Sequence, residues 1–121
     1  MKHEHTGIKR IISAFKNSYN GFIYAFQEEE AFRQDLLICT ILLFISFFIQ
    51  FSSTEYILLI FSLIFVLFSE LTNSAIEACI DRISPDWHKL SKAAKDIGSL
   101  LVLLSFINLI LCWTIICLKK F

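Results

Sequence analysis

The sequence predicts an all-α integral membrane protein, with an N-terminal amphipathic helix on the membrane surface followed by three transmembrane helices. Hydrophobic residues make up 56% of the 121 residues and charged residues only 18%, whereas soluble domains average about 45–50% and about 25%. A chain of this length buries only about two-thirds of its unfolded surface, so the excess apolar side chains require lipid. Long uncharged runs and one amphipathic stretch place the individual helices.

The same composition excludes several other classes of protein. One proline and three glycines argue against intrinsic disorder, a collagen-like fibre and a linker-rich multidomain chain. Eleven basic residues balance eleven acidic ones, so the net charge gives no indication of nucleic-acid binding. We therefore expect one membrane domain over residues 1–121 and no nucleic-acid partner.

The first predicted element is a surface helix over about residues 6–27. Its apolar residues recur at steps of three and four, and polar residues fill the opposite face, a spacing typical of a helix lying in the membrane surface. Thr6 is the expected N-cap. The apolar residues of this face are Ile8, Ile11, Ile12, Phe15, Tyr19, Phe22, Ile23 and Phe26.

Three uncharged runs predict the transmembrane helices. Crossing about 30 Å of hydrocarbon takes roughly 20 helical residues, a length that only the third run reaches without its flanks. The second helix is expected to extend beyond the membrane toward Ser84 and Pro85, where proline would end it. The runs are Leu36–Phe51, Tyr56–Ser69 and Ile97–Leu118, and the predicted helices cover residues 29–50, 55–83 and 90–118.

The basic residues predict the orientation in the membrane. Lysine and arginine precede the first span and lie between the second and third, whereas the turn at residues 50–55 has neither. By the positive-inside rule the N-terminus is cytoplasmic and the C-terminus lies outside.

This orientation gathers acidic residues at the cytoplasmic leaflet. At about 100° per residue, Glu70, Asn73, Glu77 and Asp81 fall within an arc of roughly 80° on the second span. A carboxylate near hydrocarbon costs about 2.5–3.5 kcal/mol, so Glu70 and Glu77 are functional candidates, the alternative being pairing with lysines that holds the helices together. Asp81 is expected to pair with Arg82 or with a neighbouring helix.

The acids that precede the first span have a simpler interpretation. Glu28, Glu29 and Glu30 are typical of a solvated helix start, and Glu29 is expected to pair with Arg33 at i,i+4. At most one of the three glutamates need be functional.

The row of polar residues on the second span, Glu70, Asn73, Glu77 and Asp81, which we call the acid stripe, contains the chemical groups that a phosphoryl-transfer site needs. Two carboxylates and an asparagine can hold Mg²⁺, a further carboxylate can accept a hydroxyl proton, and lysine can neutralise phosphate charge. The residues alone leave two readings open: cation-dependent chemistry at the inner leaflet, or an ion pathway such as a small proton-coupled transporter subunit. A third possibility, a purely structural membrane subunit, would not explain why these polar residues lie on one face of the second span.

Four segments of the sequence carry a resemblance to a known family. The run from Glu70 to Arg82, then His88-Lys-Leu-Ser and Ala94-Lys-Asp-Ile-Gly-Ser99, closely resembles the prokaryotic diacylglycerol kinase family, as does the segment at 29–34. Order, spacing and length agree over almost the whole chain. The resemblance implies a homotrimer of three-span subunits in the bacterial inner membrane, with active sites at subunit interfaces near the cytoplasmic face.

The family also implies an activity and roles for individual residues. It implies phosphorylation of diacylglycerol to phosphatidic acid by ATP and Mg²⁺, with Glu70 as the general base and with Glu29 and Glu77 as metal ligands. The implied nucleotide-site residues are Arg10, Asn17, Glu29, Asn73, Glu77, Asp86, Trp87, His88, Lys95 and Asp96. The implied lipid-site residues are Arg10, Ala14, Ser18, Tyr19, Ala25, Ala31, Phe32, Arg33, Gln34, Asp35, Glu70, Ser99 and Trp113.

A related branch of the family phosphorylates undecaprenol, which is the alternative acceptor. That branch is expected to carry threonine at the position of Ser74 and alanines at those of Gly98 and Ser99. Both differences favour diacylglycerol.

Overall fold

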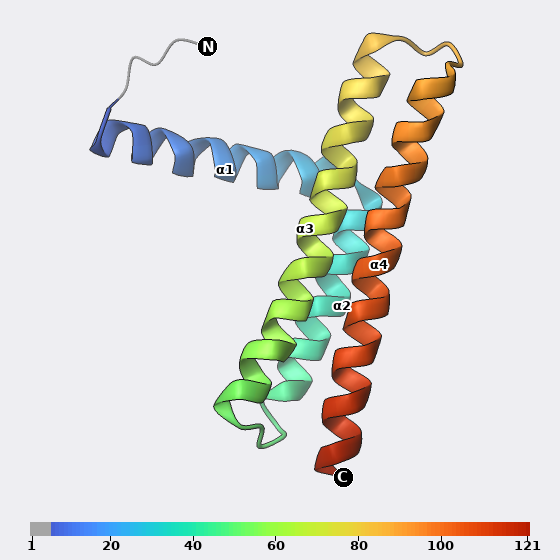
Figure 1. Cartoon of the computed structure of the whole chain (residues 1–121). Helices are drawn as coiled ribbons and strands as arrows, with labels where there is room; N and C mark the ends of the chain where they lie inside the picture. Colours follow the sequence, from blue (N-terminus) through green and yellow to red (C-terminus); the bar gives the residue numbers. More distant parts are fainter. Residues whose placement is uncertain (1–5) are drawn as a thin grey trace.

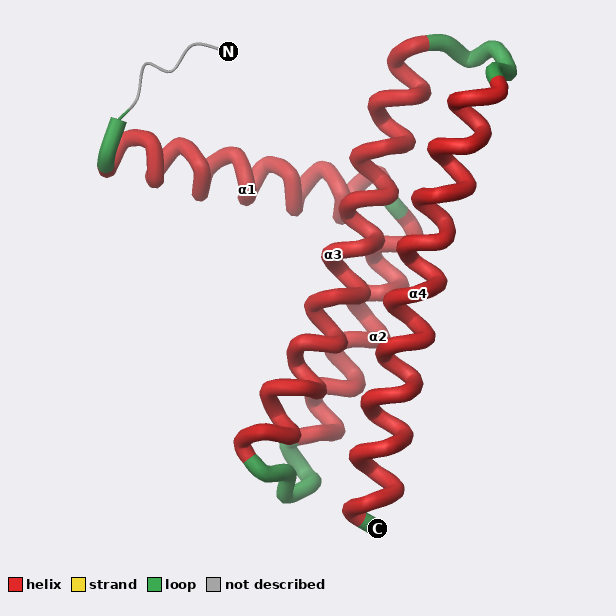
Figure 2. The backbone as a smooth tube through the Cα atoms, in the orientation of Figure 1, coloured by secondary structure: helices red, strands yellow, loops and turns green. Residues whose placement is uncertain are grey.

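The computed structural model describes residues 6–121, which contain four α-helices and no strand. Figure 1 shows α2, α3 and α4 side by side as a bundle, with α1 projecting sideways from it, and Figure 2 shows that only short loops join the helices. The predicted all-α class is confirmed. The helices are α1 (Ile8–Glu28), α2 (Glu30–Ser46), α3 (Ser53–Ile83) and α4 (Lys89–Lys120).

The start of α1 differs from the prediction that Thr6 is its N-cap. Gly7 occupies that position with φ of 60° and makes no side-chain cap; this left-handed backbone is readily adopted only by glycine. Beyond it the apolar face is open, with Ile8 75% and Phe15 73% exposed. Ala25 is the one buried residue of α1, so most of the helix offers its apolar face to its surroundings, as a membrane-surface helix would.

The break between α1 and α2 lies at Glu29, and it corrects the expected Glu29–Arg33 ion pair. Glu29 has an extended backbone (φ −114°, ψ 101°) and is the N-cap of α2, where its carbonyl accepts from the Arg33 N–H at 3.2 Å, yet among the described residues the two side chains form no ion pair. Arg33 Nη1 instead donates to the carbonyl oxygens of Phe26 at 2.7 Å and Gln27 at 3.2 Å. A cation on the last carbonyls of a helix is favourable, and here it fixes the corner from which α1 leaves the bundle.

Helix α2 is shorter than the segment predicted for the first span. It has 17 residues and ends at Ser46, four residues before position 50. The chain continues past Ser46 in tighter turns, in which the Ile49 N–H donates to the Ser46 carbonyl at 3.3 Å. The Tyr56 hydroxyl also bonds this segment, at 2.7 Å from the carbonyl oxygen of Ser46 and 2.9 Å from that of Ile49.

Helices α3 and α4, with 31 and 32 residues, are each long and apolar enough to cross a membrane. Ser52 caps α3 in a reciprocal capping box with Glu55, and the helix ends at Ile83, just before Pro85. Large apolar side chains remain exposed along both helices, as expected where lipid is the solvent. The chain is a membrane protein with at least these two apolar helices long enough to span.

The bundle core joins α2, α3 and α4. Its buried members are Cys39, Leu63, Val66 and Leu109. Trp113 packs against them and donates from Nε1 to Ser62 Oγ at 3.1 Å, which ties α4 to α3.

At the end of the bundle opposite the α3–α4 loop, Lys120 joins α4 to the turn between α2 and α3. Lys120 Nζ lies 2.9 Å from Glu55 Oε1 and 5.5 Å from the centre of the Phe51 ring. The last turn of α4 is thereby held to the α2–α3 turn.

Candidate functional site

The acid stripe of α3 runs from the protein interior to its surface. Glu70 is buried, at 6% exposure, Asn73 and Glu77 are half-buried, and Asp81 is exposed. Glu70 adjoins Asp35 of α2, itself buried at 7% exposure, and lies within electrostatic range of Glu77 and Glu29. Asp35 Oδ2 is buried without a hydrogen-bond partner. We call Glu29, Asp35, Glu70 and Glu77 the acid cluster.

Glu29 joins the cluster through a serine that the sequence reasoning missed. Ser74 Oγ donates to Glu29 Oε1 at 3.1 Å, across 45 residues of sequence. Ser74 stands four residues after Glu70 and three before Glu77, so it shares their face of α3. The hydrogen bond therefore holds the α1–α2 corner against the two turns of α3 that carry the other two glutamates. The sequence could have indicated Ser74, because this residue lies between Glu70 and Glu77 on the same face of the helix.

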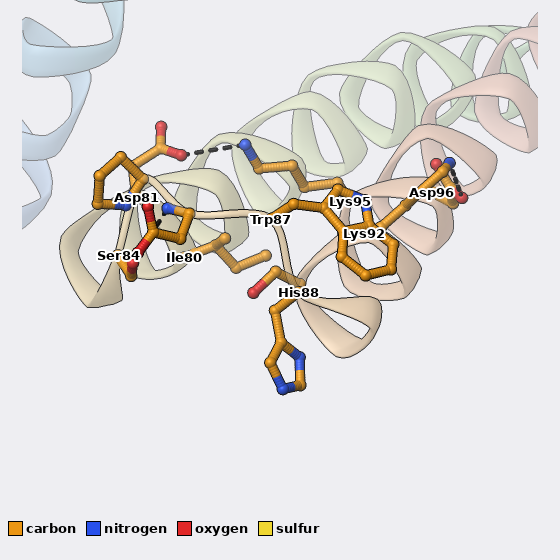
Figure 3. A pocket seen from close by; sticks show the side chains of 11 residues that line it. Ile80, Asp81, Ser84, Trp87, His88, Lys92, Lys95 and Asp96 are labelled. Atoms are coloured by element: carbon orange, nitrogen blue, oxygen red, sulfur yellow. Dashed lines mark hydrogen bonds and ion pairs between the residues drawn. The ribbon is translucent and has the colours of Figure 1, made fainter.

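A pocket of about 400 Å³ lies beneath the loop between α3 and α4, and Figure 3 shows the residues that line it. We call it the loop pocket. Five of its eleven lining residues belong to the predicted nucleotide set: Asp86, Trp87, His88, Lys95 and Asp96. The tertiary structure thus gathers half of the ten residues proposed for that role.

Two ion pairs set the charge of the loop pocket. Lys95 Nζ lies 3.0 Å from Asp81 Oδ1, so the partner of Asp81 comes from the neighbouring helix and not from Arg82. Lys92 Nζ lies 2.8 Å from Asp96 Oδ2 within α4. All four side chains are well exposed, and solvent therefore keeps these pairs weak enough to exchange partners.

His88 differs from the other predicted nucleotide residues in the loop pocket. Its Nδ1 accepts from the Leu90 backbone N–H at 3.0 Å, as the N-cap of α4. Figure 3 shows its ring pointing away from the Lys95–Asp81 pair. This nitrogen is occupied in shaping the loop, which leaves only Nε2 for a ligand.

A second hollow, of about 440 Å³, lies between α1 and α3. We call it the α1–α3 groove. Its α1 wall includes Ser18 and Ala25 from the predicted lipid set, and its α3 wall includes Ser74. The groove is largely apolar in its lining, and its polar edge is the serine that holds Glu29. The remaining lining residues are Gly21, Phe22, Tyr24, Leu71, Ala75 and Ala78.

Other predicted residues stay apart from both hollows within one chain. Arg10 precedes Glu28 by 18 residues, or about 27 Å of helix, and with Asn17 it is exposed on the projecting part of α1. Trp113 bonds Ser62, eight residues or about 12 Å along α3 from Glu70.

The remaining predicted lipid residues lie near the α1–α2 corner or farther out. Phe32 is buried, with its ring edge-on to Phe22, and Arg33 is bound to the end of α1. The exposed members are Ala14, Tyr19, Ala31, Gln34 and Ser99.

The acid cluster suits a cation that takes few ligands from protein. Within residues 6–121 no group of three or more His, Cys, Asp or Glu side chains is arranged to hold a metal by itself. Mg²⁺ usually takes one or two carboxylates, keeps several waters and draws its other ligands from phosphates. The half-buried pair Glu29 and Glu77 fits that ligand set.

Comparison with known proteins identifies the family. The model of the family described as "Prokaryotic diacylglycerol kinase" matches residues 16–117. A diacylglycerol kinase from Pseudomonas aeruginosa is 47% identical over 94 residues, covering 78% of this chain and 76% of its own. That from Escherichia coli K12 is 38% identical over 116 residues, covering 96% and 95%. That from Helicobacter pylori 26695 is 33% identical over 107 residues, covering 88% and 84%. The chain therefore belongs to the prokaryotic diacylglycerol kinase family of lipid kinases.

Proposed function

We propose that this chain transfers the γ-phosphoryl group of ATP to the free hydroxyl of diacylglycerol at the cytoplasmic face of the bacterial inner membrane. The observation that carries the proposal is the hydrogen bond from Ser74 to Glu29, because it places a third carboxylate beside Glu70 and Glu77. Relatives at 38–47% identity bear the name diacylglycerol kinase. Three carboxylates beside two successive turns of α3 meet the needs of that reaction.

Each substrate has a hollow of suitable chemistry. The α1–α3 groove is lined mostly by apolar and small side chains and flanks a helix with an open apolar face, so a lipid could reach it from the bilayer. The loop pocket carries the two lysines Lys92 and Lys95, which suit the phosphates of a nucleotide arriving from water. Along α3, Glu70 and Glu77 alternate with the groove residues, and the loop pocket begins three residues after Glu77.

In the proposed mechanism Glu70 is the general base. The lipid hydroxyl oxygen attacks the γ-phosphorus, the bond from that phosphorus to the bridging oxygen of ADP breaks, and the hydroxyl proton passes to a Glu70 oxygen. Such a transfer depends on positioning and electrostatics rather than covalent catalysis. Burial of Glu70 beside Asp35 excludes water from the base, and Lys95 is placed to contact the phosphates once it leaves Asp81.

Magnesium has a defined place in this proposal. Glu29 and Glu77 would hold it together with the nucleotide phosphates, and the ion would neutralise their charge during transfer. Ser74 keeps the Glu29 carboxylate aimed at α3, and Asn73 stands between Glu70 and Glu77 on the same stripe. This arrangement gives Glu70 and Glu77 separate tasks, as base and as metal ligand.

The proposed assembly is a homotrimer of three-span subunits with a cytoplasmic N-terminus and an external C-terminus. Arg10 and Asn17 lie too far along α1 to join the loop pocket of their own chain, so they support a site completed by a neighbouring subunit. The proposed first span continues from α2 through the turn that Tyr56 holds.

The decisive experiment supplies purified protein with radiolabelled ATP, Mg²⁺ and one of three lipids: diacylglycerol, undecaprenol or ceramide, with a lipid-free control. Label in phosphatidic acid is the expected result. Label only in undecaprenyl phosphate would transfer the assignment to undecaprenol kinase. No labelled lipid, together with proton flux in reconstituted vesicles, would favour the transporter subunit and refute the proposal.

A further inference from the structure

Gly98 is buried in α4 where this helix crosses Asn73 of α3. A Cβ placed on Gly98 would collide with Asn73 Oδ1 and would lie 3.2 Å from Asn73 Cγ. The other two glycines, Gly7 and Gly21, have nothing within 4 Å of such an atom. The Asn73 carboxamide therefore fills the space that any other residue at position 98 would need.

The contact determines which end of the Asn73 amide faces α4. Asn73 Oδ1 is buried and has no conventional hydrogen-bond partner within residues 6–121. The Cα–H groups of glycine are weak donors that meet carbonyl oxygens where helices pack closely, so the oxygen is the atom that belongs against Gly98. The NH₂ group lies on the other side of Cγ. It is therefore the part of the Asn73 side chain that is free to donate a hydrogen bond near Glu70 and Glu77.

Buried and half-buried contacts farther along the two helices limit sliding of α4 against α3. Trp113 Nε1 donates to Ser62 Oγ at 3.1 Å, and Leu109 of α4 belongs to the same buried cluster as Leu63 and Val66 of α3. These contacts hold the register that brings Asn73 against Gly98.

We propose that Gly98 is a positioning residue that makes Asn73 a hydrogen-bond donor to an anionic oxygen in the phosphoryl-transfer site, rather than a ligand of the cation. Asparagine binds cations through its carbonyl oxygen, and here that oxygen is committed to Gly98. This role rests on the proposed function. It revises the sequence-based interpretation in which two carboxylates and an asparagine hold Mg²⁺.

A stability cycle tests the contact without requiring any activity. Gly98→Ala should lower the thermal midpoint of the purified protein in detergent, whereas in an Asn73→Ala background the same change should cost much less, because the space is vacant. Gly21→Ala is the matched stability control: it lies in a helix, and its new Cβ meets nothing. Equal losses in both backgrounds, or no loss in either, would overturn the contact.

A second pair of variants tests the donor role. Asn73→Asp keeps an oxygen and adds charge but loses the NH₂ group, and Asn73→Ala loses both. We expect both to lower kcat by roughly 10²-fold, the cost of losing one donor at a developing charge, and to leave binding of Mn²⁺ with ATP, measured by electron paramagnetic resonance, nearly unchanged. Gly98→Ala should lower kcat in the same way with an unchanged Mg²⁺ midpoint.

Two results would overturn the donor role: activity retained by Asn73→Asp, or Mn²⁺ binding lost in Asn73→Ala. If the wild-type chain phosphorylated no lipid, the proposed function would fail while the stability cycle still decided the contact. The two failures are therefore distinguishable.

Discussion

Replacing Ser74 with alanine should raise the Mg²⁺ concentration needed for half-maximal activity. The hydroxyl of Ser74 is 3.1 Å from Glu29 Oε1, and the residue is only 9% exposed. A hydrogen bond to a charged group contributes about 1.5–3 kcal/mol, which corresponds to roughly 10- to 150-fold in an equilibrium constant. Residues that orient a metal ligand typically contribute 10- to 100-fold in metal affinity. We therefore expect the midpoint to rise by about 10- to 100-fold.

The assay is the initial rate of diacylglycerol phosphorylation against free Mg²⁺, at saturating ATP and lipid. Glu77→Gln is the comparator, since loss of a proposed ligand should raise the midpoint at least as far as loss of the serine that orients Glu29. Ser105→Ala is the matched control. Ser105 is buried, but its hydroxyl donates to Val102 of its own helix at 2.7 Å, so the midpoint should not move.

An unchanged midpoint in Ser74→Ala would refute the reasoning that Glu29 is held in place for the metal. So would a shift no larger than that of Ser105→Ala. A loss of kcat with an unchanged midpoint would place Ser74 in the lipid groove, which it also lines, and would remove it from the metal site.

Three further predictions address the base, the assembly and the far end of the bundle. Glu70→Gln should abolish phosphoryl transfer while the oligomer stays intact by size-exclusion chromatography, because it removes the proton acceptor at nearly constant shape; near-wild-type rates would exclude Glu70 as base. Mixed oligomers of Glu70→Gln and Lys95→Ala chains should regain part of the activity if subunits share sites, and the absence of any recovery would favour sites within one chain. Lys120→Gln should lower the thermal midpoint slightly, because the Glu55 pair and the Phe51 contact are lost. Lys119→Gln is its control, and equal thermal midpoints for the two variants would show that the pair contributes nothing.

The sequence predicted those features that depend on local pattern. The three- and four-residue spacing from Ile8 to Phe26 indicated the helix now seen as α1, and Pro85 indicated where α3 stops. The stripe from Glu70 to Asp81 followed from helical geometry alone, because side chains three and four residues apart share a face. The family followed from the motifs in α3 and α4.

Features that depend on contacts between helices were not predictable in the same way. The expected pair of Glu29 with Arg33 is replaced by two other contacts: Ser74 of α3 bonds the Glu29 carboxylate, and Arg33 bonds the end of α1. The turn that follows α2 is bonded by Tyr56, a residue of the next helix. Neither set of contacts has a signal in the local sequence.

The sequence by itself determined the helical class, the membrane environment and the row of acids on α3, because hydropathy and helical period act over a few neighbouring residues. Only the tertiary structure decided that Ser74 holds Glu29 beside that row and that Gly98 receives the Asn73 carboxamide. Those partners are 45 and 25 residues apart in the chain. These contacts depend on how whole helices pack against each other, and the local sequence of one helix does not determine which residues of its neighbour it will contact.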